Sequence, residues 1–212
     1  EYLFEQINDA VSRIKAILDT DRLSRGIHLI MLDSREEMGR LFGHNYKGLS
    51  IRKDDLALFV YNAEIRPYFR HELFHLMAYR AWGDSKTRLL NEGGAMYADN
   101  RCLSYENPVI VINKYLLESR KWFDFQELVT DFQEKASEND LIAYFQSACM
   151  FKHLYENYAR EKLIKLWQLG FTELQDIYGF DLQQLEIKIR QELENTPHIN
   201  VDWSELMQKG CG

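Results

Sequence analysis

Residues 66–80 read RPYFRHELFHLMAYR, so two of the chain's 6 histidines and a glutamate stand among large apolar side chains. The apolar positions from about residue 67 to residue 83 follow the period of a helix. On that helix His71 and His75 are one turn apart and project side by side, as two ligands of one tetrahedral metal ion would. Glu72 points about 100° away around the axis, off the metal but within reach of a metal-bound water. The His-Glu-x-x-His pattern therefore predicts a zinc site with Glu72 as its general base.

A catalytic zinc site needs a third protein ligand, and the next predicted helix offers one. Residues 91–99 read NEGGAMYAD and begin sixteen residues after His75, which leaves room for a turn and an antiparallel return. Glu92 can then face the histidines. Each glycine costs about 1 kcal/mol inside a helix, so the pair predicts that this helix packs very closely against its neighbour, as a metal shared with the histidine helix demands. Asp99, two turns beyond Glu92 on the same face, is a candidate to orient a liganding histidine.

Each of these residues can also be explained by an ordinary structural role, without a metal. Two histidines can be core or surface side chains that are satisfied by ordinary hydrogen bonds. Glu92 and Asp99, each taken alone, can belong to a solvated helix face. The complete motif on one helix, followed by the acidic segment on the next, favours the metal site.

The rest of the pattern predicts an α+β fold in a single domain, residues 1–212, with a small mixed lobe at about 1–83 and a helical lobe at about 84–212. The expected elements are helices at 1–19, 35–42, 67–83, 89–101, 124–136, 140–158, 160–169, 172–178 and 181–194, and strands at 27–32, 49–52 and 56–61. Ser34 with Glu37 predicts a capping box. The strand at 56–61 precedes the zinc helix and is expected to offer its edge to an extended peptide.

Composition narrows the classes of partner. The net charge is −7 and the basic residues are scattered, which argues against nucleic acid or an anionic membrane as the partner. No apolar run is long enough for a transmembrane segment. The 3 cysteines, Cys102, Cys149 and Cys211, are odd in number and widely spaced, so neither a disulfide framework nor a cysteine zinc site is expected. The start without methionine indicates a processed form or an excised fragment, so the compartment stays open, with a lean to an extracytoplasmic location.

These motifs resemble those of the gluzincin metallopeptidases, within the peptidase-MA-like set. The resemblance rests on His71-Glu-Leu-Phe-His75 and Asn91-Glu-Gly-Gly-Ala95, followed by Tyr97 and Asp99, and extends more weakly over residues 27–194. It implies a zincin-like fold and a Zn²⁺ ion held by His71, His75 and Glu92. It also implies that Tyr144, in the position of the family's transition-state tyrosine, stabilises the oxyanion. His153 and Tyr155 are the reserve candidates for that role.

The chain also departs from the aminopeptidase branch of this family. It lacks that branch's Gly-x-Met-Glu-Asn segment, whose glutamate binds the free amino terminus of a substrate, and Glu64 is a poor substitute. The expected function is therefore peptide hydrolysis by an endopeptidase or a processing peptidase, acting on peptide or protein substrates. A catalytically silent zinc-binding module and an enzyme for other carbonyl substrates are the alternatives. Glu72 argues against the silent module, because a structural zinc site has no use for a base beside the metal.

Overall fold

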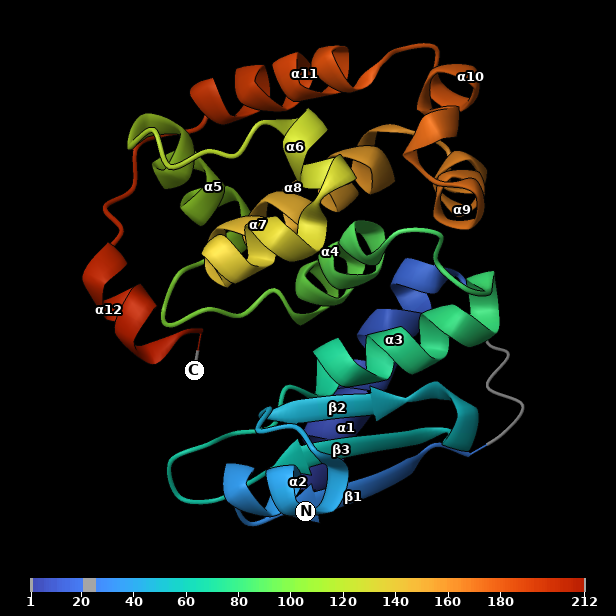
Figure 1. Cartoon of the computed structure of the whole chain (residues 1–212), viewed down its shortest axis with the longest axis vertical. Helices are drawn as coiled ribbons and strands as arrows, with labels where there is room; N and C mark the ends of the chain where they lie inside the picture. The colour runs from blue at the N-terminus through green and yellow to red at the C-terminus, as the bar shows by residue number, and fades with distance from the viewer. Residues whose placement is uncertain (1, 21–25, 212) are drawn as a thin grey trace. The chain divides into compact units, whose positions relative to one another are not determined.

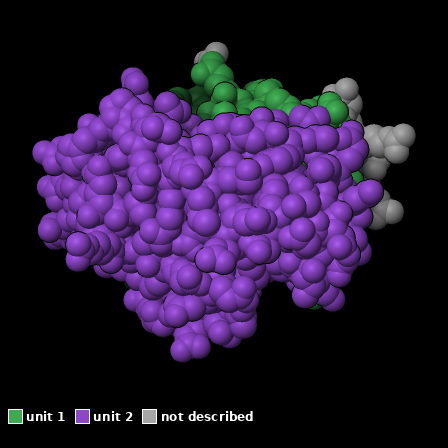
Figure 2. Space-filling view, turned by 90° about the horizontal axis from the view of Figure 1, so that it is seen from above, with its two compact units in different colours: residues 1–83, 212 green, residues 84–211 purple. Residues whose placement is uncertain are grey.

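The computed structural model describes residues 2–20 and 26–211, which form two compact units, one within residues 1–83 and one within residues 84–211 (Figure 2). The described chain is mostly helical with one three-stranded sheet, consistent with the predicted α+β class (Figure 1). The first unit contains α1 (Tyr2–Leu18), β1 (His28–Leu32), α2 (Arg35–Phe42), β2 (Gly48–Ile51), the 3₁₀ turn η1 (Arg52–Asp54), β3 (Leu56–Val60) and α3 (Phe69–Trp82).

The second unit consists of helices. They are α4 (Arg88–Asp99), α5 (Pro108–Glu118), α6 (Phe125–Thr130), α7 (Phe132–Glu138), α8 (Asp140–Asn157), α9 (Arg160–Leu169), η2 (Phe171–Glu173), α10 (Leu174–Tyr178), α11 (Leu182–Glu194) and α12 (Trp203–Lys209). None of the helices in the described part of the chain is long and apolar enough to cross a bilayer.

The strand order β1-β3-β2 places β3 in the middle of the sheet. β3 pairs in parallel with β1, with His28 opposite Leu56, and antiparallel with β2, with Gly48 opposite Phe59. The prediction that residues 56–61 offer a free edge to a peptide is therefore wrong. The parallel pairing runs through the α2 crossover, which joins segments that are distant in sequence, so the local pattern of β3 could not reveal it.

The two faces of β3 pack on different helices. Phe59 makes an edge-to-face contact with Phe69 of α3, with ring centroids 4.8 Å apart. Leu58 and Val60 point to the other face and share a buried cluster with Met38 of α2. The alternation of side chains along a strand thus explains why every residue after Leu56 in this short strand is buried.

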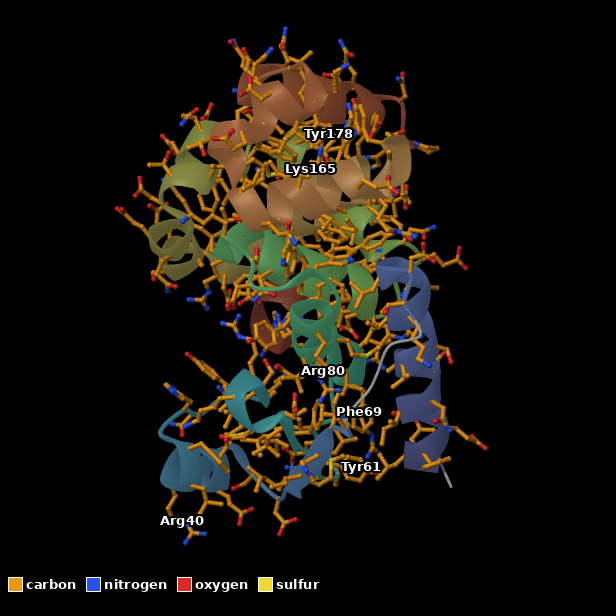
Figure 3. The ribbon with its side chains drawn as sticks, turned by 90° about the vertical axis from the view of Figure 1, so that its right-hand side faces the viewer. Arg40, Tyr61, Phe69, Arg80, Lys165 and Tyr178 are labelled. Carbon is orange, nitrogen blue, oxygen red and sulfur yellow. A yellow bond between two sulfur atoms is a disulfide. The ribbon has the colours of Figure 1, made fainter. Side chains whose placement is uncertain are left out.

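Contacts near the C-terminal end of α3 fix this helix within the first unit. It begins at Phe69, two residues later than the sequence suggested, and ends at Trp82 before Gly83, which has φ 84°. Near its end lies Arg80, which is labelled in Figure 3. Its Nε donates to Asp55 Oδ1 at 3.1 Å, and its Nη2 lies 2.7 Å from the same oxygen and donates to the carbonyl of Gly26. These contacts fix the rotation of α3 about its axis relative to the end of η1.

The second unit is built around α8, which is buried on nearly all sides and lies in the middle of its helices (Figure 1). Inside it, the Asn113 side-chain amide of α5 donates to the carbonyl of Phe145, and Gln146 bonds both backbone groups of Phe123. These hydrogen bonds give α8 a defined position against α5 and the segment before α6, although the Asn113 side-chain oxygen is buried without a hydrogen-bond partner among the described residues.

The single helix predicted at 124–136 is two helices in the structure. Asp124 caps α6 by accepting from the backbone N–H groups of Gln126 and Glu127. Asp131 has φ −128° and ψ 44°, outside the helical region, and separates α6 from α7. The tail beyond residue 195 adds α12, whose Trp203 stacks on Tyr115 at 5.5 Å, so the tail is part of the second unit's core.

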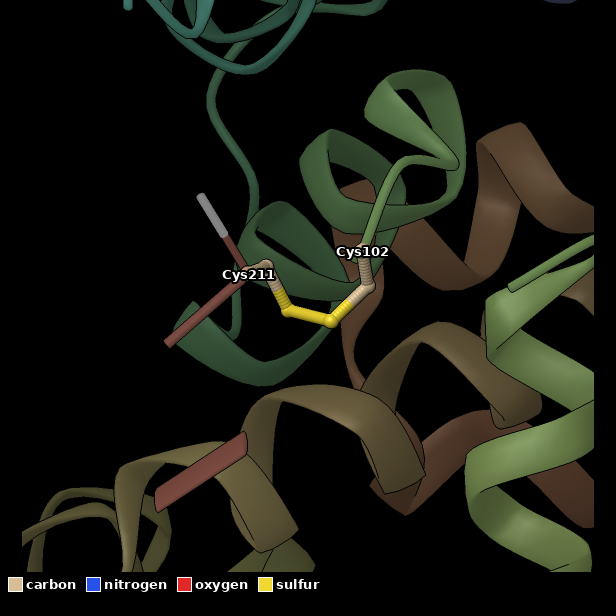
Figure 4. The surroundings of a disulfide bond; sticks show 2 residues. All are labelled: Cys102 and Cys211. Carbon is tan, nitrogen blue, oxygen red and sulfur yellow. A yellow bond between two sulfur atoms is a disulfide. The ribbon is translucent and has the colours of Figure 1, made fainter. Parts of the chain in front are cut away.

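A disulfide joins Cys102, after α4, to Cys211 at the end of the tail (Figure 4). The expectation that the cysteines form no disulfide was wrong, because an odd count and wide spacing do not prevent two distant cysteines from meeting in the fold. Cys149 remains a free thiol and is buried in α8, where burial raises its pKa to about 12. The bond closes a loop with a sequence separation of 109 residues.

We expect reduction of this disulfide, or the substitution Cys211→Ser, to lower the free energy of unfolding of the second unit by about 4 kcal/mol. The reason is that the cross-link removes conformational freedom from the unfolded chain, and the effect grows with the length of the closed loop. Urea unfolding with and without dithiothreitol measures the change. The Cys211→Ser variant is the control, since reductant should change it no further; equal midpoints for the oxidised and reduced wild type would contradict the expectation.

Candidate metal centre

His71 and His75 lie on one face of α3, as the spacing predicted. Their ring centroids are 4.9 Å apart and the ring planes are inclined by 81°. His75 is buried and His71 is half-buried, since α3 packs apolar residues on both sides of this face. The helix, itself fixed by its contacts to the sheet, therefore presents both imidazoles in a defined arrangement.

Glu72 is buried beside the start of β2. A Cβ atom added to Gly48 would lie 2.7 Å from Glu72 Oε1 and 2.8 Å from its Cγ. Only a glycine lets the strand approach the carboxylate this closely. These two distances show that the backbone of β2 passes directly beside Glu72, the predicted general base.

Glu92 stands in the second turn of α4. The helix begins after Thr87, whose Oγ1 accepts from the Leu90 N–H at 3.3 Å, and ends at Asn100, which has a left-handed conformation. The Glu92 side chain is 12% exposed, and its Oε1 accepts from Arg88 Nε at 3.4 Å. A well-capped helix and a neighbouring cation thus hold the carboxylate.

One donor atom each from His71, His75 and Glu92 lies within 4.8 Å of the others, which is close enough for the three to share a metal ion. Two imidazoles and a carboxylate are a donor set that suits Zn²⁺, which binds each at about 2.0–2.2 Å. Ligands at such distances in a tetrahedron lie about 3.4 Å apart, so small side-chain adjustments suffice. The residues present therefore fit a divalent metal.

Tyr144 lies beside Glu92 on the neighbouring helix, α8. Its hydroxyl accepts from Arg88 Nη2 at 3.3 Å. Burial and the negative charge of Glu92 raise the pKa of Tyr144 to about 12, while Arg88 acts in the opposite direction. At neutral pH the phenol therefore keeps its proton and can donate it in a hydrogen bond.

The other predicted site residues have structural partners of their own. Asp99 is buried, and its Oδ1 accepts from Arg101 Nη2 at 2.9 Å. His153 is buried and its Nδ1 lies 2.9 Å from Glu192 Oε2, while the Tyr155 hydroxyl accepts from Arg160. Of the three candidates for oxyanion donor, Tyr144 is the one tied to Glu92 through a shared partner. The orienting role of Asp99 stays a prediction.

The structure shows very close packing of α4 at Gly93, but the partner is α8 and not the histidine helix α3, which we had expected because the two would share a metal. A Cβ atom on Gly93 would lie 2.7 Å from the carbonyl carbon of Ser147 and closer still to its oxygen. The backbones of the two helices therefore touch at this point. Because Gly93 follows Glu92 directly, this contact also fixes where Glu92 stands relative to Tyr144.

No family model matches the chain, and no curated protein or solved structure matches it either. Its function must therefore be inferred from its own residues.

Two residues near the site were not predicted from the sequence, Arg88 and Gly48. Arg88 does carry a signal, because it precedes Glu92 by four residues, the spacing of an ordinary helix ion pair. Gly48 reads locally as a loop residue after a tyrosine and a lysine. Its closeness to Glu72 depends on the pairing of β2 with β3, which brings the strand across the start of α3.

We expect Gly93→Ala to lower the free energy of unfolding of the second unit by about 1–3 kcal/mol, because the new methyl group meets the backbone of α8. Helix propensity alone predicts the opposite sign, a gain of up to about 1 kcal/mol. Chemical denaturation of both proteins measures the difference. Gly26→Ala is the control, since nothing lies within 4 Å of its added Cβ, and it should change stability by less than about 0.5 kcal/mol. A stabilised Gly93→Ala protein would contradict the close contact.

Proposed function

We propose that the chain is a zinc-dependent peptidase of the gluzincin type, with a zincin-like fold. The observation that supports this most strongly is the convergence of donor atoms from His71, His75 and Glu92 within 4.8 Å. They come from a His-Glu-x-x-His segment and an Asn-Glu-Gly segment, the two motifs on which the resemblance rests. Glu72 and Tyr144 add a candidate base and a candidate hydrogen-bond donor.

A zinc ion bound here would supply a Lewis acid and would lower the pKa of its bound water towards neutrality. In the proposed reaction the Glu72 carboxylate takes a proton from the attacking water and later gives it to the leaving amine. Its position next to His71 in the helix keeps it beside the metal ligands without being one of them. Tyr144 donates its hydrogen bond to the oxygen that becomes negative as water adds to the carbonyl.

The proposed substrate is an extended peptide that is cut within the chain. β2 replaces β3 as the candidate strand for peptide binding, because no further strand pairs with its outer edge within residues 2–20 and 26–211. It begins at Gly48, directly beside Glu72. A peptide that adds to this edge by backbone hydrogen bonds would pass the base with little selection for sequence.

The proposed location is outside the cytoplasm. The Cys102–Cys211 disulfide supports this, since such bonds persist mainly in oxidising compartments.

We expect His71→Ala and Glu92→Ala to weaken zinc binding by about 100-fold or more, because each removes one of three protein ligands. Glu72→Gln should keep the zinc affinity of the wild type but lower kcat by about 10²–10⁴-fold, because it removes only the proton acceptor. Competition with a chelator gives the affinities, and cleavage of a peptide library gives the rates. Glu36→Gln, an exposed residue of α2, is the matched control.

The outcomes separate the alternatives. Zinc binding without cleavage of any peptide by the wild type would favour a catalytically silent zinc-binding module. Cleavage of esters but not of peptides would favour an enzyme for other carbonyl substrates. If Glu92→Ala left the zinc affinity unchanged, the assignment of the third ligand would be wrong.

We also expect Gly48→Ala to lower kcat by about 100-fold while zinc affinity stays unchanged. The added methyl group must displace the Glu72 carboxylate, and a shift of about 1 Å in a catalytic group can cost that much. Stopped-time peptide assays and chelator competition measure the two quantities. Gly26→Ala controls for the loss of a glycine from the same unit. Full activity in Gly48→Ala would show that the position of Glu72 does not limit the reaction.

A further inference from the structure

Arg88 joins three helices of the second unit through one guanidinium group. It lies one turn before Glu92 on α4, and its Nε donates to Glu92 Oε1 at 3.4 Å. Nη2 donates to the Tyr144 hydroxyl of α8 at 3.3 Å, and Nη1 donates to Gln133 Oε1 of α7. The same cation therefore contacts both the proposed third metal ligand and the proposed oxyanion donor.

The chemistry of these bonds suits an arginine in particular. A guanidinium is planar, stays charged at any physiological pH and carries its N–H groups in a fixed fork, so it can hold several acceptors in set directions. A lysine ammonium at the end of a flexible stem could replace the charge but not this geometry. Burial acts to lower the pKa of Arg88, but the neighbouring Tyr144 and Glu92 outweigh it and raise the pKa.

The direction of each hydrogen bond matters for the proposed reaction. Because Arg88 only donates, the Tyr144 oxygen accepts from it, and the phenol proton is left to donate elsewhere. Likewise, the bond from Arg88 to Oε1 of Glu92 restricts the rotation of the carboxylate. An exposed ion pair contributes little by itself; here the Arg88 side chain is 50% exposed, but that of Glu92 is only 12% exposed, so the carboxylate is the part of the pair that is shielded from water.

We propose that Arg88 is a positioning residue that sets the orientation of both Glu92 and Tyr144 in this site. It acts through those two side chains and need not touch the substrate. This inference rests on the proposed function, because it assigns Glu92 to a metal and Tyr144 to the oxyanion. Groups that orient a metal ligand in this way typically change metal affinity or activity by about 10–100-fold when removed.

The surroundings of Arg88 allow a direct test by chemical rescue. Its side chain is 50% exposed and lines an open pocket of about 620 Å³, together with residues of α6 and α7 such as Val129, Phe132 and Ser137. If Arg88 is shortened to alanine, a guanidinium ion from solution can enter the vacated space from this pocket. A merely structural contribution of the Arg88 stem would not be restored by a free cation.

The experiment compares Arg88→Ala, Arg88→Lys and Lys86→Ala in the full chain. Lys86 lines the same pocket and controls for the loss of positive charge. For Arg88→Ala we expect zinc affinity and kcat each to fall by about 10–100-fold, with KM changed by less than about threefold. Millimolar guanidinium should restore part of both losses. Arg88→Lys should be intermediate, and Lys86→Ala should behave as the wild type.

A double-mutant cycle with Tyr144→Phe tests the link to the oxyanion donor. If Arg88 works partly through Tyr144, the loss in kcat of the double variant should be smaller than the product of the two single losses. Unfolding midpoints of all variants show whether each protein is folded at the assay temperature.

Different results would overturn the positioning role of Arg88 and the proposed peptidase function. Wild-type zinc affinity and kcat in Arg88→Ala would overturn the positioning role and leave the proposed function intact. A loss confined to KM would also overturn it, because it would show that Arg88 binds substrate. A wild-type chain that binds no zinc would overturn the proposed function, and the inference about Arg88 with it.

Discussion

The contact between the backbones of α4 and α8 at Gly93 and Ser147 sets the geometry of the second unit's half of the candidate site. Glu92 stands next to this contact on α4, and Tyr144 stands one turn before Ser147 on α8. A larger residue at Gly93 would meet the backbone of α8 and push the two helices apart, which would lengthen the distance from Arg88 on α4 to Tyr144 on α8. The cost of a glycine in the interior of α4 is therefore offset by the hydrogen bonds that the close approach permits.

The features that the sequence predicted correctly are those set by local spacing. The one-turn separation of His71 and His75 needs only a helix, and the side chain of Ser34 caps α2 by accepting from the Glu37 N–H as expected. The capping box is only half formed, however, because the Glu37 carboxylate accepts from the N–H of Asp33 and not from that of Ser34. The break at Asp131 was missed, because the helical period of the apolar residues continues through it from α6 to α7. The Cys102–Cys211 bond depends on where the tail after Glu194 folds back, which no local pattern encodes.

Arg88 illustrates the limit of such reasoning within the site itself. In the sequence it is one of many charged residues four positions from an opposite charge, and most such pairs on helices are solvated and weak. The residues around Arg88 in the sequence do not indicate a contact with Tyr144, which is 56 residues away. Only the fold shows that a single guanidinium reaches both the carboxylate and the phenol. The role of Tyr144 was expected from resemblance alone, and its place beside Glu92 gives that expectation a physical basis.

The pairing of Glu92 with Arg88 also bears on how a metal would behave in the proposed site. A carboxylate ligand neutralises part of the charge of a divalent ion, which strengthens binding but weakens the ion as a Lewis acid. A cation on one oxygen of that carboxylate draws negative charge towards itself, so less is available to the metal. In the proposed site Arg88 would thus act in two directions, because orienting Glu92 strengthens zinc binding and drawing charge from Glu92 weakens it. A fall in zinc affinity on removal of Arg88 requires that the orienting effect be the larger of the two.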